Sequence, residues 1–209
     1  MGLQRSLVIG CGALARELVT ITRQLPSTEV ACLPADLHNR PGGIPGAVRS
    51  RIADARADGF DHIFVAYADC GTGGLLDRVL TDEKVERLPG AHCYEFYAGS
   101  DAFAHLADEE IGTFYLTDFL VRHFDALVIR GLGLDRFPQL RDDYFGNYRR
   151  VVHLAQFDDP AAAARAKAAA ARLGLAYERR LTGLGGLRAF IDRATVGRET
   201  HKRESLWPA

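Results

Sequence analysis

Segments with the composition of β-strands alternate with segments of helical spacing along nearly the whole chain. The predicted strands cover 7–10, 30–33, 63–66, 85–88, 151–157 and 176–181, and the predicted helices cover 14–25, 45–58, 71–80, 93–98, 113–130, 160–173 and 187–194. Such alternation favours parallel strands joined by right-handed crossovers. We therefore predict an α/β fold, a single Rossmann-like domain over 1–196 with a mainly parallel sheet flanked by helices, followed by a charged tail at 197–209.

Composition limits the classes of partner. The 209 residues suit one large domain, and a hydrophobic content of 47% is enough for a sizeable core. A net charge of −1 gives no broad basic field, so nucleic acid is not an expected partner. The most apolar stretch, 114–132, is interrupted by charged residues, whereas a membrane span needs about 18 apolar residues. We expect a cytoplasmic protein with reduced thiols, so its cysteines are candidate metal ligands, catalytic groups or core residues.

Three of the four cysteines follow apolar segments. Cys11 comes directly after strand 7–10, Cys70 follows the run 63–69, and Cys93 closes the segment 88–92. Loops beyond the carboxyl ends of parallel strands are where open α/β sheets bind ligands. The sequence therefore predicts that Cys11, Cys70 and Cys93 converge on one metal site with a vacant position. Cys32 lies inside a strand pattern without a neighbouring glycine, and we assign it to the core.

Soft sulfur ligands favour zinc, and a [4Fe–4S] cluster on the same three cysteines is the alternative. No C-x-x-C spacing is present, which argues against a zinc finger or ribbon. The fourth position would be taken by water, His38, His92 or a substrate thiol. A loop histidine such as His38 is also often only solvated. Asp69 or His92 is the expected proton acceptor, or a residue that orients a ligand.

The first strand–helix junction, 10–15, matches the G-x-G-x-x-[GA] dinucleotide fingerprint through Gly10 and Gly12. An NAD site also requires an acidic residue near the end of the second strand, but 31–34 there reads Ala-Cys-Leu-Pro. The same turn would place the Cys11 sulfur at a helix N-terminus, where a thiolate is stabilised. The turn therefore has two alternative roles: Gly10 and Gly12 bind a dinucleotide, or the turn holds the Cys11 thiolate at the metal site.

The segment 113–118 begins the predicted long helix 113–130. There Thr113 would cap the helix and Asp118 would be solvated. Alternatively, Tyr115 and Asp118 would face the site.

Five segments carry a family resemblance: 11–14 (CGAL), 37–41 (LHNRP), 67–71 (YADCG), 92–94 (HCY) and 113–118 (TFYLTD). Through them the chain resembles, over nearly its full length, the family called domain of unknown function 1638. The resemblance implies a loose association with corrinoid-dependent methyl transfer from methylated amines. It therefore implies a corrinoid protein as a possible partner.

A zinc ion on three thiolates carries net negative charge, so it is a poor Lewis acid for hydrolysis. It would instead keep a substrate thiol deprotonated and nucleophilic. We therefore expect a metal-dependent transferase that moves a methyl group to a thiol or similar small-molecule acceptor. The alternatives are a [4Fe–4S] enzyme, a non-catalytic metal or corrinoid carrier or chaperone, and a dinucleotide-binding oxidoreductase. The sequence predicts no oligomeric state.

Overall fold

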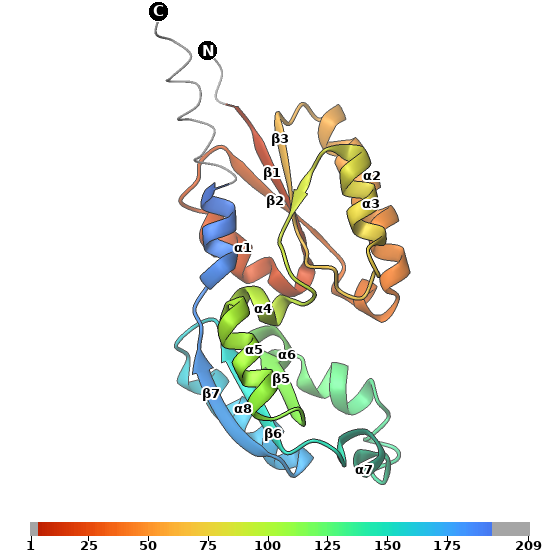
Figure 1. The fold of residues 1–209 in the computed structure, drawn as a ribbon, viewed down its shortest axis with the longest axis vertical. Helices are drawn as coiled ribbons and strands as arrows, with labels where there is room; N and C mark the ends of the chain where they lie inside the picture. The colour runs from red at the N-terminus through yellow and green to blue at the C-terminus, as the bar shows by residue number, and fades with distance from the viewer. Residues whose placement is uncertain (1–3, 194–209) are drawn as a thin grey trace, which may run out of the picture. The chain divides into compact units, whose positions relative to one another are not determined.

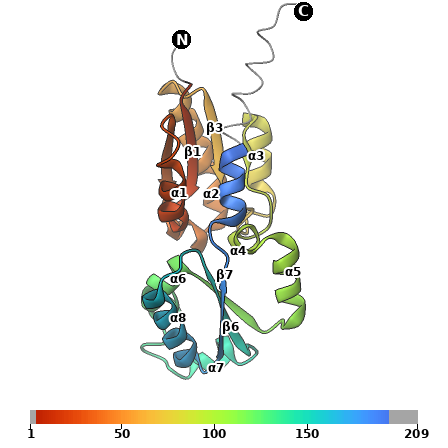
Figure 2. The same ribbon diagram turned by 90° about the vertical axis from the view of Figure 1, so that its left-hand side faces the viewer.

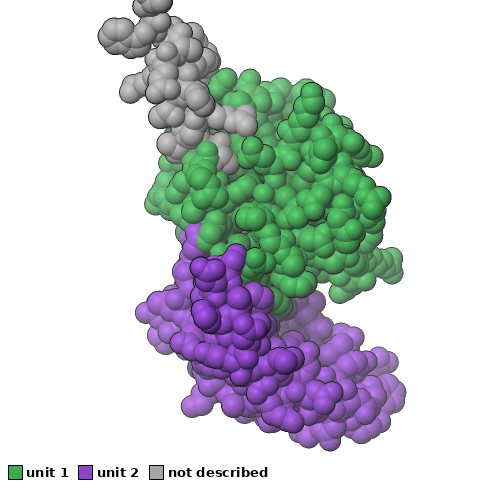
Figure 3. Space-filling model, in the orientation of Figure 1, with its two compact units in different colours: residues 1–96, 186–209 green, residues 97–185 purple. Residues whose placement is uncertain are grey.

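The computed structural model describes residues 4–193, shown as a ribbon in two views in Figures 1 and 2. The chain divides into two compact units (Figure 3). Unit 1 contains the residues up to Phe96 and those from Gly186 onward, and unit 2 spans Tyr97–Gly185. Each unit has its own parallel sheet flanked by helices. The predicted α/β class with parallel strands is thus confirmed, and the strands form two sheets instead of one.

The sheet of unit 1 has four strands in the order β2-β1-β3-β4, and every neighbouring pair is parallel. β1 is buried at every position, as expected for an inner strand of a parallel sheet whose two faces are covered. The strands are β1 Ser6–Cys11, β2 Thr28–Leu33, β3 His62–Ala66 and β4 Glu86–Arg87.

The helices of unit 1 cover both faces of this sheet. In Figure 1, α2 and α3 lie side by side on one face, while α1 and the helical residues 185–193 lie on the other. The elements are η1 Gly12–Leu14, α1 Ala15–Thr22, η2 Ala35–Asn39, η3 Pro41–Gly43, α2 Ile44–Ala57, α3 Leu75–Glu83 and α4 Cys93–Ala98. The predicted helix 187–194 is therefore helical as far as the structure describes it, and the predicted tail 197–209 lies outside the described residues.

The sheet of unit 2 has three parallel strands in the order β5-β6-β7. Its strands are β5 Thr113–Thr117, β6 Arg150–Ala155 and β7 Ala176–Leu181, and its helical elements are α5 Ser100–Glu109, α6 Asp118–Arg122, η4 Asp125–Arg130, α7 Leu140–Phe145 and α8 Pro160–Leu173. α8 has the predicted bounds because its ends carry strong local signals. Asp159 caps its first amides, and Gly174 follows it with a left-handed φ of 74°.

The prediction of one helix over 113–130 is wrong. Residues 113–117 form β5, which pairs with β6 in parallel register. These residues are β-branched or aromatic in four of five positions, a composition that favours strands. The Thr117 hydroxyl then accepts a hydrogen bond from the Leu120 amide at 3.4 Å, so the helix begins at Asp118. The N-cap is Thr117, not Thr113.

The assignment of Cys32 to the core is also wrong, because this residue is exposed. β2 lies at one edge of its sheet, and no residue of it is fully buried. An apolar strand pattern therefore did not predict burial at this position.

Within 4–193, no helix is both long enough and apolar enough to cross a membrane.

Candidate metal centre

Each strand of the unit 1 sheet leads into a segment that carries a cysteine or a histidine. Cys11 is the last residue of β1, and His38 lies in η2 beyond β2. Cys70 follows β3, and Cys93 begins α4 beyond β4. Because the four strands are parallel, all four segments leave the same edge of the sheet. The sheet thus gathers four candidate metal ligands, three thiols and one imidazole, at its carboxyl edge.

The Cys11 side chain is held inside the turn that follows β1. It is 3% exposed, and its Sγ accepts a hydrogen bond from the Ala13 amide at 3.3 Å. His38 Nδ1 lies 3.6 Å from the same sulfur. Burial raises the pKa of Cys11, and the Ala13 amide partly opposes this effect. The turn therefore presents sulfur next to an imidazole.

Chain packing accounts for both glycines of the fingerprint. A Cβ on Gly10 would lie 2.3 Å from Leu18 Cδ1, and one on Gly12 would lie 3.0 Å from the Leu33 carbonyl oxygen. Gly10 thus lets α1 pack on β1, and Gly12 lets the turn approach the end of β2. The Ala13 amide, which a pyrophosphate would require, already binds the Cys11 sulfur. The structure therefore explains this motif without a dinucleotide.

Asp69 shapes the loop that carries Cys70. Its carboxylate accepts hydrogen bonds from the Thr72 hydroxyl at 2.6 Å, the Gly74 amide at 2.9 Å and the Gly73 amide at 3.2 Å. These bonds, led by the one from Thr72, lower the pKa of Asp69. Cys70 itself has a left-handed φ of 51°. The contacts of Asp69 indicate that it positions this loop, and its role as a proton acceptor stays a prediction.

The segment before Cys93 is tied to the Cys70 loop by backbone hydrogen bonds. The Asp69 amide donates to the Gly90 carbonyl at 3.1 Å, and the Cys70 amide donates to the Ala91 carbonyl at 2.9 Å. These bonds fix the two cysteine-bearing segments next to each other.

Arg87 supports the same segment from β4. Its Nη1 donates to the carbonyl oxygens of Leu88 at 2.6 Å and Gly90 at 3.2 Å, while Nε and Nη2 bind Asp77 at 2.6 and 2.9 Å. This guanidinium is therefore engaged in holding the chain that leads to Cys93.

The three thiols affect one another electrostatically. Burial, followed by a charge on Cys11, raises the pKa of Cys70 to about 11. Burial raises the pKa of Cys93 to about 12, with added contributions from charges on Cys70 and Cys11. The three thiols are therefore harder to deprotonate than free cysteines. A bound cation would lower their pKa values. Within 4–193, no three His, Cys, Asp or Glu side chains already stand together as a metal-binding group.

The two histidines differ in their surroundings. Partial burial lowers the pKa of His38, which favours the neutral imidazole that binds metals. His38 keeps solvent access, and its ring stacks on that of Tyr67 with centroids 6.3 Å apart and planes 16° apart. His92 is exposed, and its ring lies beside Tyr94, at 6.4 Å between centroids. The structure thus brings His38 next to a thiol and places His92 in solvent.

A family model described as protein of unknown function (DUF1638) matches residues 32–191. The chain belongs to the DUF1638 family. The matched segment contains His38, Cys70 and Cys93, and it begins after β1 and Cys11. This confirms the resemblance predicted from the sequence. Neither a curated protein nor a solved structure matches this DUF1638 chain.

Unit 2 of this DUF1638 protein contains a buried polar network that the sequence analysis missed. Asp118 and His153 are 3% and 0% exposed, and His153 Nε2 lies 2.8 Å from Asp118 Oδ1. Asp118 Oδ2 accepts the amides of Gln156 at 3.2 Å and Phe157 at 3.0 Å. The expectation that Asp118 is solvated is therefore wrong. A lone histidine within the apolar run of β6 was the available signal.

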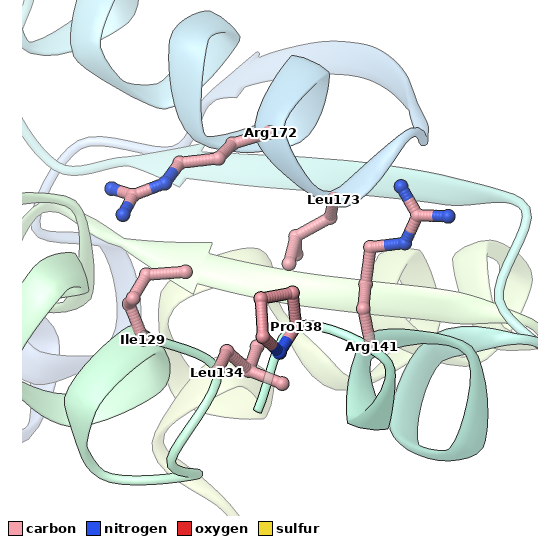
Figure 4. A pocket seen from close by; sticks show the side chains of 6 residues that line it. All are labelled: Ile129, Leu134, Pro138, Arg141, Arg172 and Leu173. Carbon is pink, nitrogen blue, oxygen red and sulfur yellow. The ribbon is translucent and has the colours of Figure 1, made fainter. Parts of the chain in front are cut away.

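Unit 2 also has a small cavity of about 240 Å³ (Figure 4). In Figure 4 the guanidinium groups of Arg141 and Arg172 point away from each other. Arg172 pairs with Asp125 and Arg141 with Asp142. The arginines do not converge on a common ligand, and no residue predicted for the DUF1638 site lines the cavity. Tyr115, in β5, also belongs to unit 2.

Proposed function

We propose that unit 1 binds a soft metal ion, zinc in the first instance, through the thiolates of Cys11, Cys70 and Cys93. His38 is the candidate for the fourth position. The observation that carries this proposal is that a cysteine or histidine follows each of four parallel strands, with Cys11 and His38 3.6 Å apart.

The distance between Cys11 and His38 fits ligation of one zinc ion. Bonds of about 2.3 Å to sulfur and 2.0–2.1 Å to nitrogen, at a tetrahedral angle, separate the two ligand atoms by about 3.5–3.6 Å. Cys11 Sγ and His38 Nδ1 are 3.6 Å apart. The pair therefore has the spacing of two ligands of a tetrahedral site. The presence of an imidazole beside Cys11 also favours zinc over a [4Fe–4S] cluster, because imidazole suits a single zinc ion.

The raised thiol pKa values are compatible with this role. Metal ions bind thiolates and displace their protons, so metal affinity should fall as the pH falls. The Ala13 amide donates to the Cys11 sulfur and would support its thiolate. The hydrogen bonds of Asp69 and Arg87 hold the loops of Cys70 and Cys93 in place, as residues around a metal site commonly do.

For the reaction class, we propose transfer of a methyl or alkyl group to a small-molecule thiol. When bound, zinc on three thiolates would keep an incoming thiol deprotonated yet nucleophilic. The family resemblance makes a corrinoid protein the candidate methyl donor. His92, exposed directly before α4, is the candidate group for taking up the thiol proton. A carrier that only holds the metal would use the same four ligands without turnover.

The metal proposal is tested by titrating anaerobic protein with zinc against a chromophoric chelator. We expect one zinc per chain, and at least a 100-fold loss of affinity in each of Cys11→Ser, Cys70→Ser and Cys93→Ser. Cys32→Ser is the matched control because this thiol is exposed and lies within β2. Zinc binding by the three variants as tight as in the control would contradict the proposal.

Two further readouts separate the alternatives. Absorbance near 400 nm in anaerobically purified protein would indicate a [4Fe–4S] cluster instead of zinc. A rise in melting temperature with NAD(P)H would indicate a dinucleotide site, because a ligand that binds only the folded state stabilises it.

A further inference from the structure

The hydroxyl of Tyr67 is buried without a hydrogen-bond partner among the residues that the structure describes. The whole residue is 1% exposed. Buried hydroxyl groups nearly always have a partner, because leaving one unpaired is energetically costly. A missing acceptor at this position therefore points to a ligand.

The surroundings of Tyr67 direct this hydroxyl to the metal centre. Tyr67 follows β3 and precedes the Cys70 loop, and its ring stacks on His38. His38 Nδ1 is in turn 3.6 Å from Cys11 Sγ. Burial raises the pKa of both Tyr67 and Cys11, and the two side chains interact: Tyr67 partly opposes the rise at Cys11, and Cys11 adds to the rise at Tyr67. Their contact nevertheless lacks the geometry of a hydrogen bond. The phenol is thus a neighbour of both candidate ligands.

Nearby polar groups are already committed elsewhere. The Asp69 carboxylate accepts from Thr72, Gly73 and Gly74. Arg87 binds Asp77 and two backbone carbonyls, so it offers no free positive charge to a phosphate or carboxylate. A ligand of this site would therefore be bound through the metal and the Tyr67 hydroxyl.

We propose that Tyr67 donates its hydroxyl hydrogen to the sulfur of a small-molecule thiolate that replaces His38 in the fourth position. This inference rests on the proposed metal site. A thiolate is a soft ligand suited to zinc, and hydrogen bonds to charged acceptors are stronger than those between neutral groups. The proton of the incoming thiol is taken up by His92, the candidate acceptor named above, and passes from there to solvent. Tyr67 is a substrate-binding residue in this account and does not ligate the metal.

The test uses full-length protein loaded with Co²⁺, whose visible spectrum reports sulfur ligation, and 2-mercaptoethanol as the probe. Wild-type protein should show a saturable spectral change on addition of the thiol. In Tyr67→Phe, the dissociation constant for the thiol should rise about tenfold or more, the loss expected for a hydrogen bond to a charged group. Co²⁺ affinity, measured by competition, should stay within about twofold. Tyr144→Phe, at an exposed position in α7, is the matched control and should bind the thiol like the wild type.

The outcomes distinguish the inference from the function on which it rests. Co²⁺ binding without any thiol-dependent change, or equal thiol affinity in Tyr67→Phe and wild type, would overturn the inference and leave the metal site standing. Failure to bind Co²⁺ through sulfur would overturn both. If Tyr67→Phe does not fold, His38→Ala decides the question. Removing the competing imidazole should tighten thiol binding, and unchanged or weaker binding would overturn the inference.

Discussion

Replacing Asp118 by alanine should destabilise unit 2 far more than removing an exposed aspartate. The carboxylate of Asp118 serves three donors: His153 Nε2 at 2.8 Å, the Phe157 amide at 3.0 Å and the Gln156 amide at 3.2 Å. Asp118 is 3% exposed and His153 is 0% exposed, so water cannot easily replace the lost acceptor.

The size of the effect follows from these contacts. Each orphaned buried donor costs about 1–3 kcal/mol, and the substitution leaves three donors without their acceptor. We therefore expect Asp118→Ala to lower the free energy of unfolding by about 3–5 kcal/mol. With a urea dependence of about 2 kcal/mol per molar, the unfolding midpoint would fall by about 1.5–2.5 M.

The assay is urea unfolding followed by far-ultraviolet circular dichroism, with hydrogen exchange of β6 peptides to assign the loss to unit 2. The matched control is Asp125→Ala, which removes an exposed pair with Arg172, whose side chains are 65% and 52% exposed. Exposed pairs contribute about 0–1 kcal/mol, so this variant should lose little. If the two variants prove equally stable, the buried network has no such energetic role.

Two further variants test the structure of unit 1. Gly10→Ala should destabilise the protein by about 1–3 kcal/mol because its Cβ would lie 2.3 Å from Leu18 Cδ1. The control Gly46→Ala, in α2, should be neutral or stabilising because its Cβ would have no neighbour within 4 Å. Thermal melts that rank the two variants in the opposite order would contradict this packing. The hydrogen bond from Arg87 lowers the pKa of Asp77, so the stability it contributes is complete above the unfolded pKa near 3.8 and is lost as the pH falls through the folded pKa. The difference in unfolding midpoint between wild type and Asp77→Asn should therefore narrow below about pH 4, and a gap that does not change with pH would refute this assignment.

Local signals allowed much of the fold to be predicted. The strand at 63–66 and the helix at 160–173 were found because each carries a strong composition or capping signal. β5 was taken for a helix because its continuation, Asp118–Arg122, is helical and the boundary depends on the cap at Thr117. The division into two sheets depends on long-range strand pairing, which no local pattern reports.

The candidate site could be predicted in outline only. Parallel strands bring their carboxyl ends to one edge, so cysteines after 7–10 and 63–69 were expected near each other. His38 was predicted only as one of several candidates for the fourth position, because its approach to Cys11 depends on the path of η2. Tyr67 was noted as part of an apolar run and of the family segment 67–71, but it was given no role, since a sequence does not show which buried hydroxyl lacks a partner.

X-ray absorption at the zinc edge of anaerobic, zinc-loaded protein tests the metal site most directly. We predict three sulfur atoms at about 2.3 Å and one nitrogen at about 2.0–2.1 Å, supplied by Cys11, Cys70, Cys93 and His38. Cys11→Ser should lose one sulfur from this shell, while Cys32→Ser should leave the spectrum unchanged. A shell made only of nitrogen and oxygen, or three sulfurs retained in Cys11→Ser, would contradict the proposed site.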